Sequence, residues 1–325
     1  MPDTPIRLSR RTLLAAAPAL LAAPALARSA GPSETLQGAA FGTGWRVTLP
    51  VDAPRPPVAR IAALLAEVDA QMSPWRADSE IGRFNGGLRE MPVATDTAAV
   101  TRAALRLAEA SGGAFDPTVG PLVSRWGFGP IAGESRREGW RGIEAGDRGI
   151  GKADAGLTLD LCGIAKGYAL DRLAALLLDA GTRDVLVDLG GELAAHGRHP
   201  SGRDWHVAVE DPREGATGAA EILRLGGRAV ATSGDKVNGY TLAGRRYGHI
   251  IDPPAAEPVA GALASVSVVA DSGMEADGWA TALFAAGEGR GPALAEARGI
   301  AALFLFRDGD GLRRHMTAAL AAHLA

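Results

Sequence analysis

Cysteine and aromatic residues are scarce in this sequence, and neither sign of charge dominates. Cys162 is the single cysteine among 325 residues, so an intramolecular disulfide is excluded and packing must hold the fold unaided. Aromatic side chains make up 5%, so the core has to be built mostly from Ala, Leu and Val. With 34 Lys and Arg against 37 Asp and Glu, the formal net charge is -3, which argues against nucleic-acid binding.

Several common motifs are missing as well. The sequence has no Gly-x-Gly-x-x-Gly after the first strand, no Walker loop, no Cys/His spacing for zinc and no Gly-x-Ser-x-Gly elbow. Common nucleotide-binding folds and serine hydrolases are therefore disfavoured. The composition itself, 47% hydrophobic and 22% charged, is that of an ordinary globular protein.

The first 27 residues resemble an export signal. Arg7, Arg10 and Arg11 precede an apolar run from Leu13 to Leu26, which is too short to span a bilayer comfortably. Residues 9–14 resemble the twin-arginine signal, and residues 25–27 read Ala-Leu-Ala, the small-x-small pattern of a cleavage site. We therefore expect twin-arginine export, a periplasmic location and no membrane-spanning segment. The alternative is an N-terminal helix that is buried or lies on a membrane.

The remaining chain alternates helical and strand patterns. Residues 28–57 are expected to form an extended segment around one strand, 45–51, and residues 58–325 a single domain. Apolar periodicity predicts helices over 58–72, 95–111, 163–180, 274–285 and 316–324. Strands are predicted over 185–189, 205–210, 222–225, 229–232, 248–251, 265–269 and 301–307. Together these patterns predict an α+β domain with two lobes.

Two glycine- or proline-containing loops carry candidate binding residues. Residues 72–85 contain Trp75, whose flat ring could stack on a ligand ring. Residues 112–122 place Asp116 and Thr118 on an irregular backbone. Ordinary loop structure explains both segments equally well.

Residues 158–168 lead from an apolar strand through glycine into a helix. Such a junction presents free backbone N–H groups and a positive dipole end, which suit a phosphate. Lys166 would add a point charge there, and it is one of only three lysines in the chain. The alternative is a solvated lysine at a helix start.

Two further segments supply a base and an oxygen pair. His249 follows a glycine and leads an apolar pair, so it is expected at a strand mouth, where an imidazole can act as a base. Asp277 and Thr281 are four residues apart on a predicted helix, which places them on one face. Carboxylate and hydroxyl oxygens suit Mg²⁺ rather than Zn²⁺. The alternatives are a structural histidine and an acid that favours the helix dipole.

Taken together and in this order, these segments resemble the ApbE family, the FAD:protein FMN transferases. Each segment is a weak signal alone, but their joint order is specific. The resemblance covers most of the chain after the export signal, and it rests on residues 72–85, 113–122, 159–171, 187–192, 231–235, 249–253 and 265–284.

The resemblance implies an ApbE-like (T-fold-like) α+β fold, in which mixed sheets and packed helices form two lobes with a flavin cleft between them. It implies that Phe41 stands in place of a methionine that contacts the flavin, with Trp75 beside the ring. The metal would be held by the Gly163 carbonyl, Asp277 and Thr281. The remaining flavin-nucleotide contacts would be Phe115, Asp116, Thr118, Asp160, Lys166 and Ile251.

Two positions depart from the family pattern. Cys162 stands where the family commonly has glycine, and residues 254–257 replace the usual Arg-Thr-Gly after the His249 strand. These changes concern the shape of loops more than the chemistry of the metal.

The implied reaction is a Mg²⁺-dependent transfer of FMN from FAD to a Thr or Ser hydroxyl of a flavoprotein, with release of AMP and with His249 as the base. By analogy, the acceptor is a periplasmic FMN-binding domain of a membrane-associated electron-transfer protein, such as one of nitrous-oxide respiration. One alternative is a Mg²⁺-dependent FAD pyrophosphatase that gives FMN and AMP. The other is a periplasmic protein that binds flavin without cutting it.

Overall fold

The computed structural model describes residues 31–325, so the predicted export signal at 1–27 lies outside the described residues. Within this range, no helix combines the length and the apolar character needed to cross a membrane. The α-helices are α1 (Val58–Met72), α2 (Glu80–Asn85), α3 (Thr95–Ala110), α4 (Gly120–Arg125), α5 (Cys162–Asp179), α6 (Gly273–Ala285) and α7 (Gly287–Arg298). The 3₁₀ helices are η1 (Gly139–Gly142) and η2 (Ala318–His323).

An eight-stranded sheet organises the molecule, and each neighbouring pair of strands in it is antiparallel. In spatial order its strands are β1 (Ser33–Ala40), β2 (Thr43–Pro50), β6 (Val185–Leu189), β7 (Glu192–His196), β10 (Ala229–Gly234), β15 (Leu263–Ala270), β16 (Ala301–Asp308) and β17 (Gly311–Met316).

Both faces of the central strands are covered. Every residue of β15 is buried. On one face of the strand, Val266 and Val268 pack with side chains of α6. On the other face, Val269 packs in a second cluster, which contains Trp205. That second cluster comes from the hairpin of β8 (Trp205–Glu210) and β9 (Ala219–Leu225), together with η2. Strands buried on both faces read as continuous apolar runs, which explains the sequence of β15 and β16.

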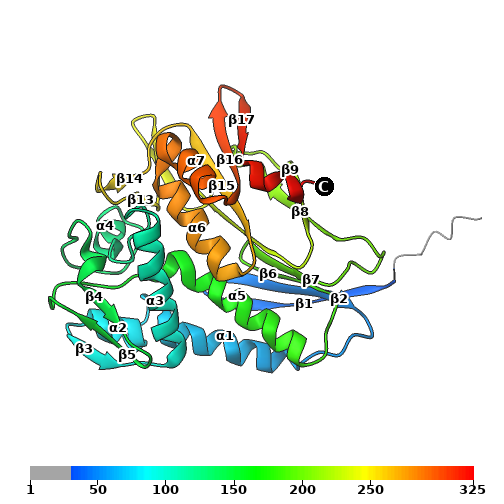
Figure 1. Cartoon of the computed structure of the whole chain (residues 1–325), viewed down its shortest axis with the longest axis horizontal. Coiled ribbons are helices and arrows are strands. Elements are labelled where there is room, and N and C mark those ends of the chain that lie inside the picture. The colour runs from blue at the N-terminus through cyan, green and yellow to red at the C-terminus, as the bar shows by residue number, and fades with distance from the viewer. Residues whose placement is uncertain (1–30) are drawn as a thin grey trace, which may run out of the picture.

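Besides the β8–β9 pair, three smaller sheets surround this framework within residues 31–325. The strands β3 (Glu90–Pro92), β5 (Gly149–Lys152) and β4 (Ile143–Ala145) form a three-stranded sheet, which lies with α2 at the opposite end of the molecule from the start of β1 (Figure 1). Two two-stranded sheets are formed by β11 (Gly239–Leu242) with β12 (Arg245–Gly248), and by β13 (Ile251–Asp252) with β14 (Glu257–Pro258).

Most elements confirm the sequence predictions. The first predicted helix is α1 with the same bounds, and the helices expected over 95–111, 163–180 and 274–285 are α3, α5 and α6 with ends that differ by one residue. The strands predicted at 185–189 and 205–210 are β6 and β8 without any change of bounds.

Three predictions of local structure are wrong. The stretch before residue 58 contains two strands, because β1 pairs with β2 along its whole length. The strand expected over 248–251 is interrupted at His249 and Ile250, which lie between β12 and β13. The helix expected over 316–324 is the end of β17 followed by the 3₁₀ helix η2, because Met316 pairs with Leu303 at the sheet edge.

Candidate active site

The helices α5 and α6 meet backbone to backbone, and this contact (the α5–α6 seam) positions the predicted metal ligands. A side chain at Gly167 would overlap the carbonyl oxygen of Gly273, so glycine is what permits the close approach. The Gly167 N–H donates a 2.8 Å hydrogen bond to Asp277 Oδ2. Asp171 on α5 accepts from the N–H groups of Gly273 and Met274, at 2.6 and 2.9 Å, and so caps the start of α6.

The three residues predicted to hold the metal lie together at this seam. A Cβ atom placed on Gly163 would lie 2.9 Å from Thr281 Cγ2 and 3.2 Å from Thr281 Oγ1. Asp277 lies one turn before Thr281 on α6, so its carboxylate shares that helix face. The Thr281 hydroxyl also lies 3.2 Å from the Ser233 hydroxyl of β10.

A buried charge cluster lies beside these residues. Lys166 Nζ is 2.9 Å from Glu192 Oε2, and the Glu192 side chain is only 4% exposed. Burial and the nearby Asp277 carboxylate, against the opposing effect of Lys166, together raise the pKa of Glu192 to about 8. Burial also raises the pKa of Asp277. The pKa of Lys166 is raised overall. Burial lowers it, but the combined effect of the Glu192 and Asp277 carboxylates is larger.

This cluster fits a hard divalent cation. When all three groups are ionised, two carboxylates face one ammonium in a buried setting, which leaves one uncompensated negative charge. Carbonyl, hydroxyl and carboxylate oxygens are the donors that Mg²⁺ prefers. Across residues 31–325, no three His, Cys, Asp or Glu side chains are grouped as a metal site. Since Mg²⁺ prefers octahedral coordination, three protein oxygens would leave positions for water or substrate oxygens.

Asp160 and the loop at 115–118 border the start of α5. Asp160 Oδ1 accepts from the Cys162 N–H at 2.9 Å, and the Asp160 N–H donates to the Pro117 carbonyl at 2.7 Å. Asp116 Oδ1 accepts from both the N–H and the hydroxyl of Thr118, at 2.8 and 2.5 Å. Asp116 is buried and Asp160 is partly buried, and their hydrogen bonds fix the loop against the start of α5. Burial raises the pKa of Asp160 and of Asp116.

The ring of Phe115 reaches the same helix start. A Cβ atom on Gly163 would lie 3.1 Å from Phe115 Cε2. The predicted nucleotide-binding loop and the predicted metal ligands therefore meet at one place, although they come from segments far apart in the sequence.

His249 faces this group from the segment between β12 and β13. Its Nδ1 lies 3.3 Å from the Asn238 carbonyl oxygen, which also accepts the His249 backbone N–H at 3.1 Å. A carbonyl can only accept, so this contact favours the tautomer with its proton on Nδ1 and leaves Nε2 free as a base. Burial is the largest influence on His249 and lowers its pKa, and the charge of Lys166 lowers this pKa too. The Asn238 contact and the carboxylates of Asp235 and Asp160 oppose this shift.

The other predicted flavin contacts lie on separate elements. Phe41 forms the turn between β1 and β2 with a positive φ of 53°, and Trp75 lies in the loop after α1 with 68% of its surface exposed. Ile251 is buried at the start of β13. Among residues 31–325, no hydrogen bond, ion pair or ring contact joins Phe41 or Trp75 to the α5–α6 seam.

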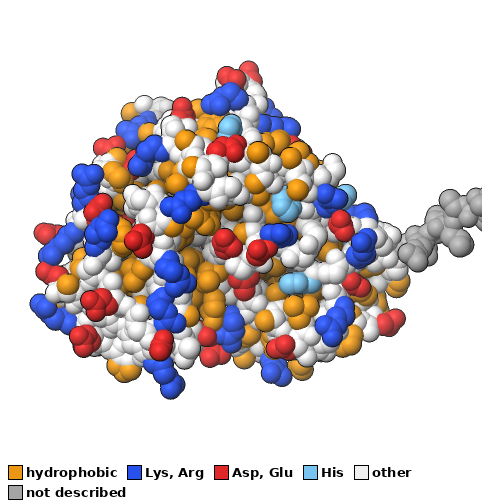
Figure 2. All heavy atoms as spheres, in the orientation of Figure 1, with side chains coloured by type: hydrophobic (Ala, Val, Ile, Leu, Met, Phe, Trp, Pro, Cys, Tyr) orange, Lys and Arg blue, Asp and Glu red, His pale blue; other side chains and the backbone are white. Residues whose placement is uncertain are grey.

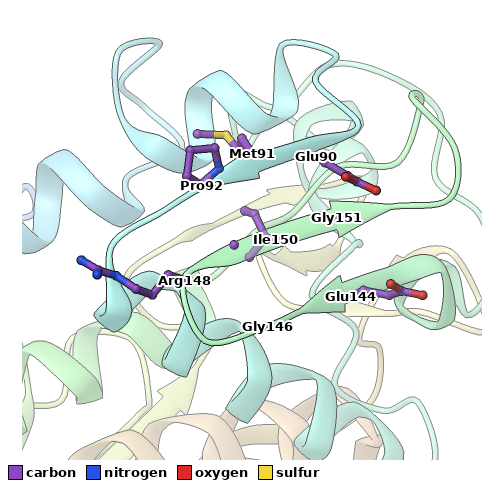
Figure 3. Close-up of a pocket in the computed structure, with 9 residues that line it drawn as sticks. Glu90, Met91, Pro92, Glu144, Gly146, Arg148, Ile150 and Gly151 are labelled. Carbon is purple, nitrogen blue, oxygen red and sulfur yellow. The ribbon is translucent and has the colours of Figure 1, made fainter.

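Two open cavities lie apart from the seam. One, of about 580 Å³, is lined by residues of all three strands of the three-stranded sheet, among them Glu90, Glu144 and Gly151 (Figure 3). It contains none of the residues that the sequence singles out. The other, of about 720 Å³, is bounded by the strands that flank the Phe41 turn and by residues 190–191. Figure 2 shows hydrophobic side chains gathered along the middle of one face, with charges around them.

Sequence reasoning missed the roles of Glu192 and Ser233. Glu192 follows the Gly190–Gly191 turn at the start of a buried strand, and an acid in that place is the signal that could have revealed it. Ser233 lies in the 231–235 segment but was assigned no role, because it meets Thr281 only where α6 packs on β10.

Comparisons with known proteins agree on one family. The sequence matches the ApbE family over residues 41–304, and the chain belongs to that family. It is similar to a protein of Vibrio cholerae serotype O1 named FAD:protein FMN transferase, with 38% identity over 82% of this chain and 84% of the relative. A relative from Klebsiella pneumoniae with the same name is 33% identical over 95% of both chains.

The solved structures agree with this assignment. The apo form of the Pseudomonas stutzeri flavinyl transferase ApbE aligns with a TM-score of 0.80 and 35% identity, over 90% of this chain and 97% of that one. This likeness confirms the predicted ApbE-type α+β fold.

Proposed function

We propose that this chain is a Mg²⁺-dependent FAD:protein FMN transferase that moves FMN from FAD to a Thr or Ser hydroxyl of another protein and releases AMP. The observation that carries the proposal is the α5–α6 seam, where Asp277, Thr281 and Gly163 lie beside the buried Lys166–Glu192 pair. Membership of the ApbE family, and relatives that bear this enzyme name, support the same reaction.

Different residues at and around the seam would bind different parts of FAD. Lys166 and the start of α5 offer positive charge and backbone N–H groups to the pyrophosphate. Asp277, Thr281 and the Gly163 carbonyl would hold Mg²⁺, which when bound neutralises charge on the pyrophosphate oxygens. Asp160 and the loop at 115–118 would line the nucleotide, with Phe41, Trp75 and Ile251 nearer the flavin ring.

His249 is the proposed general base. Its free Nε2 takes the proton of the acceptor hydroxyl while that oxygen forms a bond to the phosphorus of the FMN half. The bond between this phosphorus and the bridging oxygen breaks, and AMP leaves with that oxygen. The products are AMP and a phosphoester between FMN and the acceptor protein.

The proposed setting is the periplasm, reached by the twin-arginine route. The signal-like pattern of residues 1–27 supports this setting. The proposed acceptor is an FMN-binding domain of a membrane-associated electron-transfer protein, for example one that takes part in nitrous-oxide respiration.

The test incubates the purified protein with FAD, Mg²⁺ and an FMN-binding acceptor domain, and measures the acceptor's intact mass together with AMP. We expect the acceptor to gain the mass of FMN less one water, with the modification mapped to a Thr or Ser side chain. Release of AMP without a mass gain, across several acceptor domains, would indicate an FAD pyrophosphatase. Bound flavin with neither product would indicate a flavin-binding protein.

A further inference from the structure

Four aromatic rings form a continuous stack beside His249, and no part of the proposed reaction uses them. Trp126 stacks on Tyr247 at 5.5 Å between ring centroids, Tyr247 on Tyr240 at 5.4 Å, and Tyr240 on Phe128 at 5.4 Å. The interplanar angles lie between 18° and 21°. Tyr240 and Tyr247 are cross-strand partners in the β11–β12 hairpin, whereas Trp126 and Phe128 follow α4. We call these four rings the aromatic stack.

The stack ends against the imidazole of His249. Phe128 meets the His249 ring edge to face, with 6.4 Å between centroids and an interplanar angle of 65°. This geometry lies within the range of favourable aromatic pairs. Asn238 holds the same imidazole through its carbonyl, so the ring is fixed by one polar and one aromatic contact.

The stack also joins the hairpin to the rest of the domain. Trp126 Nε1 donates to the Ala256 carbonyl at 3.3 Å, which ties the far end of the stack to the turn between β13 and β14. The hairpin itself is poorly buried, since Leu242 is 63% exposed. The side chain of Arg246 on β12 bonds to the carbonyl of Asp235, which precedes the hairpin, and Asp235 pairs with Arg307. The aromatic stack is a second attachment, which holds Tyr240 and Tyr247 against the segment after α4.

We infer that Phe128 is a positioning residue for His249, and that the aromatic stack fixes the direction of the imidazole and keeps water from its Phe128 side. This inference rests on the proposed function, in which His249 is the base. The charged groups that face His249 are Asp160 before α5, Lys166 on α5 and Asp235 after β10. None of them restrains the plane of the ring, whereas an edge-to-face contact does.

The test compares Phe128→Ala, Phe128→Leu and Phe128→Tyr with the unchanged protein. The loss of one aromatic pair should lower kcat for FMN transfer by about tenfold in the Ala and Leu variants. The KM for FAD should change by less than about twofold, because Phe128 is outside the proposed pyrophosphate site. The Tyr variant keeps the ring and should recover most of kcat.

The pH profile separates positioning from a general structural defect. Burial lowers the pKa of His249, so admitting water beside the ring should raise this pKa toward its ordinary value. The acid limb of the kcat profile should then move to higher pH in Phe128→Ala, but not in Phe128→Tyr. A structural defect alone would lower activity without moving this limb.

Different failures point to different errors. If Phe128→Leu keeps the full kcat and the original pH profile while His249→Ala is inactive, the positioning role is wrong and the proposed base stands. If His249→Ala transfers FMN at the normal rate, the base assignment itself is wrong. Phe128→Leu retains apolar volume, so it still tests the positioning role if Phe128→Ala does not fold.

Discussion

The α5–α6 seam and the β11–β12 hairpin bring their functional groups to one site by different means. At the seam, backbone atoms of Gly167 and Gly273 touch, and main-chain N–H groups hold Asp277 and Asp171. At the hairpin, side-chain rings and one carbonyl hold His249. Backbone contacts tolerate almost no added atom, whereas a ring can be exchanged for another ring. Changes at the seam should therefore affect stability and metal affinity, and changes at the hairpin should affect rate.

Removing the carboxylate at the seam should have the largest effect. Asp277→Ala takes away a proposed metal ligand, so FMN transfer should fall by about 10³-fold or more. Some FAD should stay bound, because Lys166 and the α5 N-terminus are unchanged. Transfer assays and FAD titrations check this, with Asp179→Ala, at the exposed end of α5, as the control. Unchanged turnover in Asp277→Ala would remove this residue from the metal site.

Removing the imidazole should come next. His249→Ala is expected to lower transfer by about 10²-fold to 10³-fold, which is the usual contribution of a general base. FAD affinity and Mg²⁺ affinity should stay close to normal, because no contact of the seam depends on His249. The measurements are kcat and the FAD dissociation constant. A large loss of FAD affinity in this variant would contradict the division between hairpin and seam.

Adding one methyl group at the seam should destabilise the fold. Gly167→Ala forces a Cβ atom onto the Gly273 carbonyl oxygen, which should cost about 3 kcal/mol of unfolding free energy. Gly289→Ala on α7 is the matched control, because a Cβ there meets nothing within 4 Å. The control should be neutral or slightly stabilising, since alanine is the better helix former. Chemical denaturation compares the two, and equal stability would refute the tight seam.

The charge cluster should make stability depend on pH. Glu192 has an ordinary pKa of 4.5 that rises to about 8 in the folded protein, so the folded state binds more protons across this range. Stability without Mg²⁺ should therefore fall as pH rises from about 5 to 8, by a few degrees in Tm. Added Mg²⁺ should reduce the fall, and Glu192→Gln should flatten it. A Tm that rises over this interval, with and without Mg²⁺, would contradict the buried excess of negative charge.

Local patterns predicted the elements whose burial is regular along the chain. Helix α1 has buried Ile61, Leu65 and Val68 at helical spacing, so its bounds could be read directly. Helix α7 was missed because Gly287, Gly289, Gly291 and Pro292 are typical of loops, yet packing on β16 keeps it helical. The alanine-rich C-terminus suggested an α-helix, but Met316 pairs with β16 and the alanines that follow form only the short 3₁₀ helix η2.

The candidate site shows the same division. The spacing of Asp277 and Thr281 predicted a shared helix face, and both do lie on α6. The partners Glu192, Asn238 and Phe128 could not be predicted, because each meets its functional neighbour only after distant segments fold together. Residue spacing predicts which side chains share a face of one helix or strand, but not which distant segments they meet.

The glycine contact between α5 and α6 also limits how a substrate can enter and leave. Two helices in backbone contact cannot separate without losing the hydrogen bonds of Gly167 and Gly273 to Asp277 and Asp171. The seam therefore keeps α5 and α6 fixed relative to each other, and any opening that admits a substrate has to come from elements outside it.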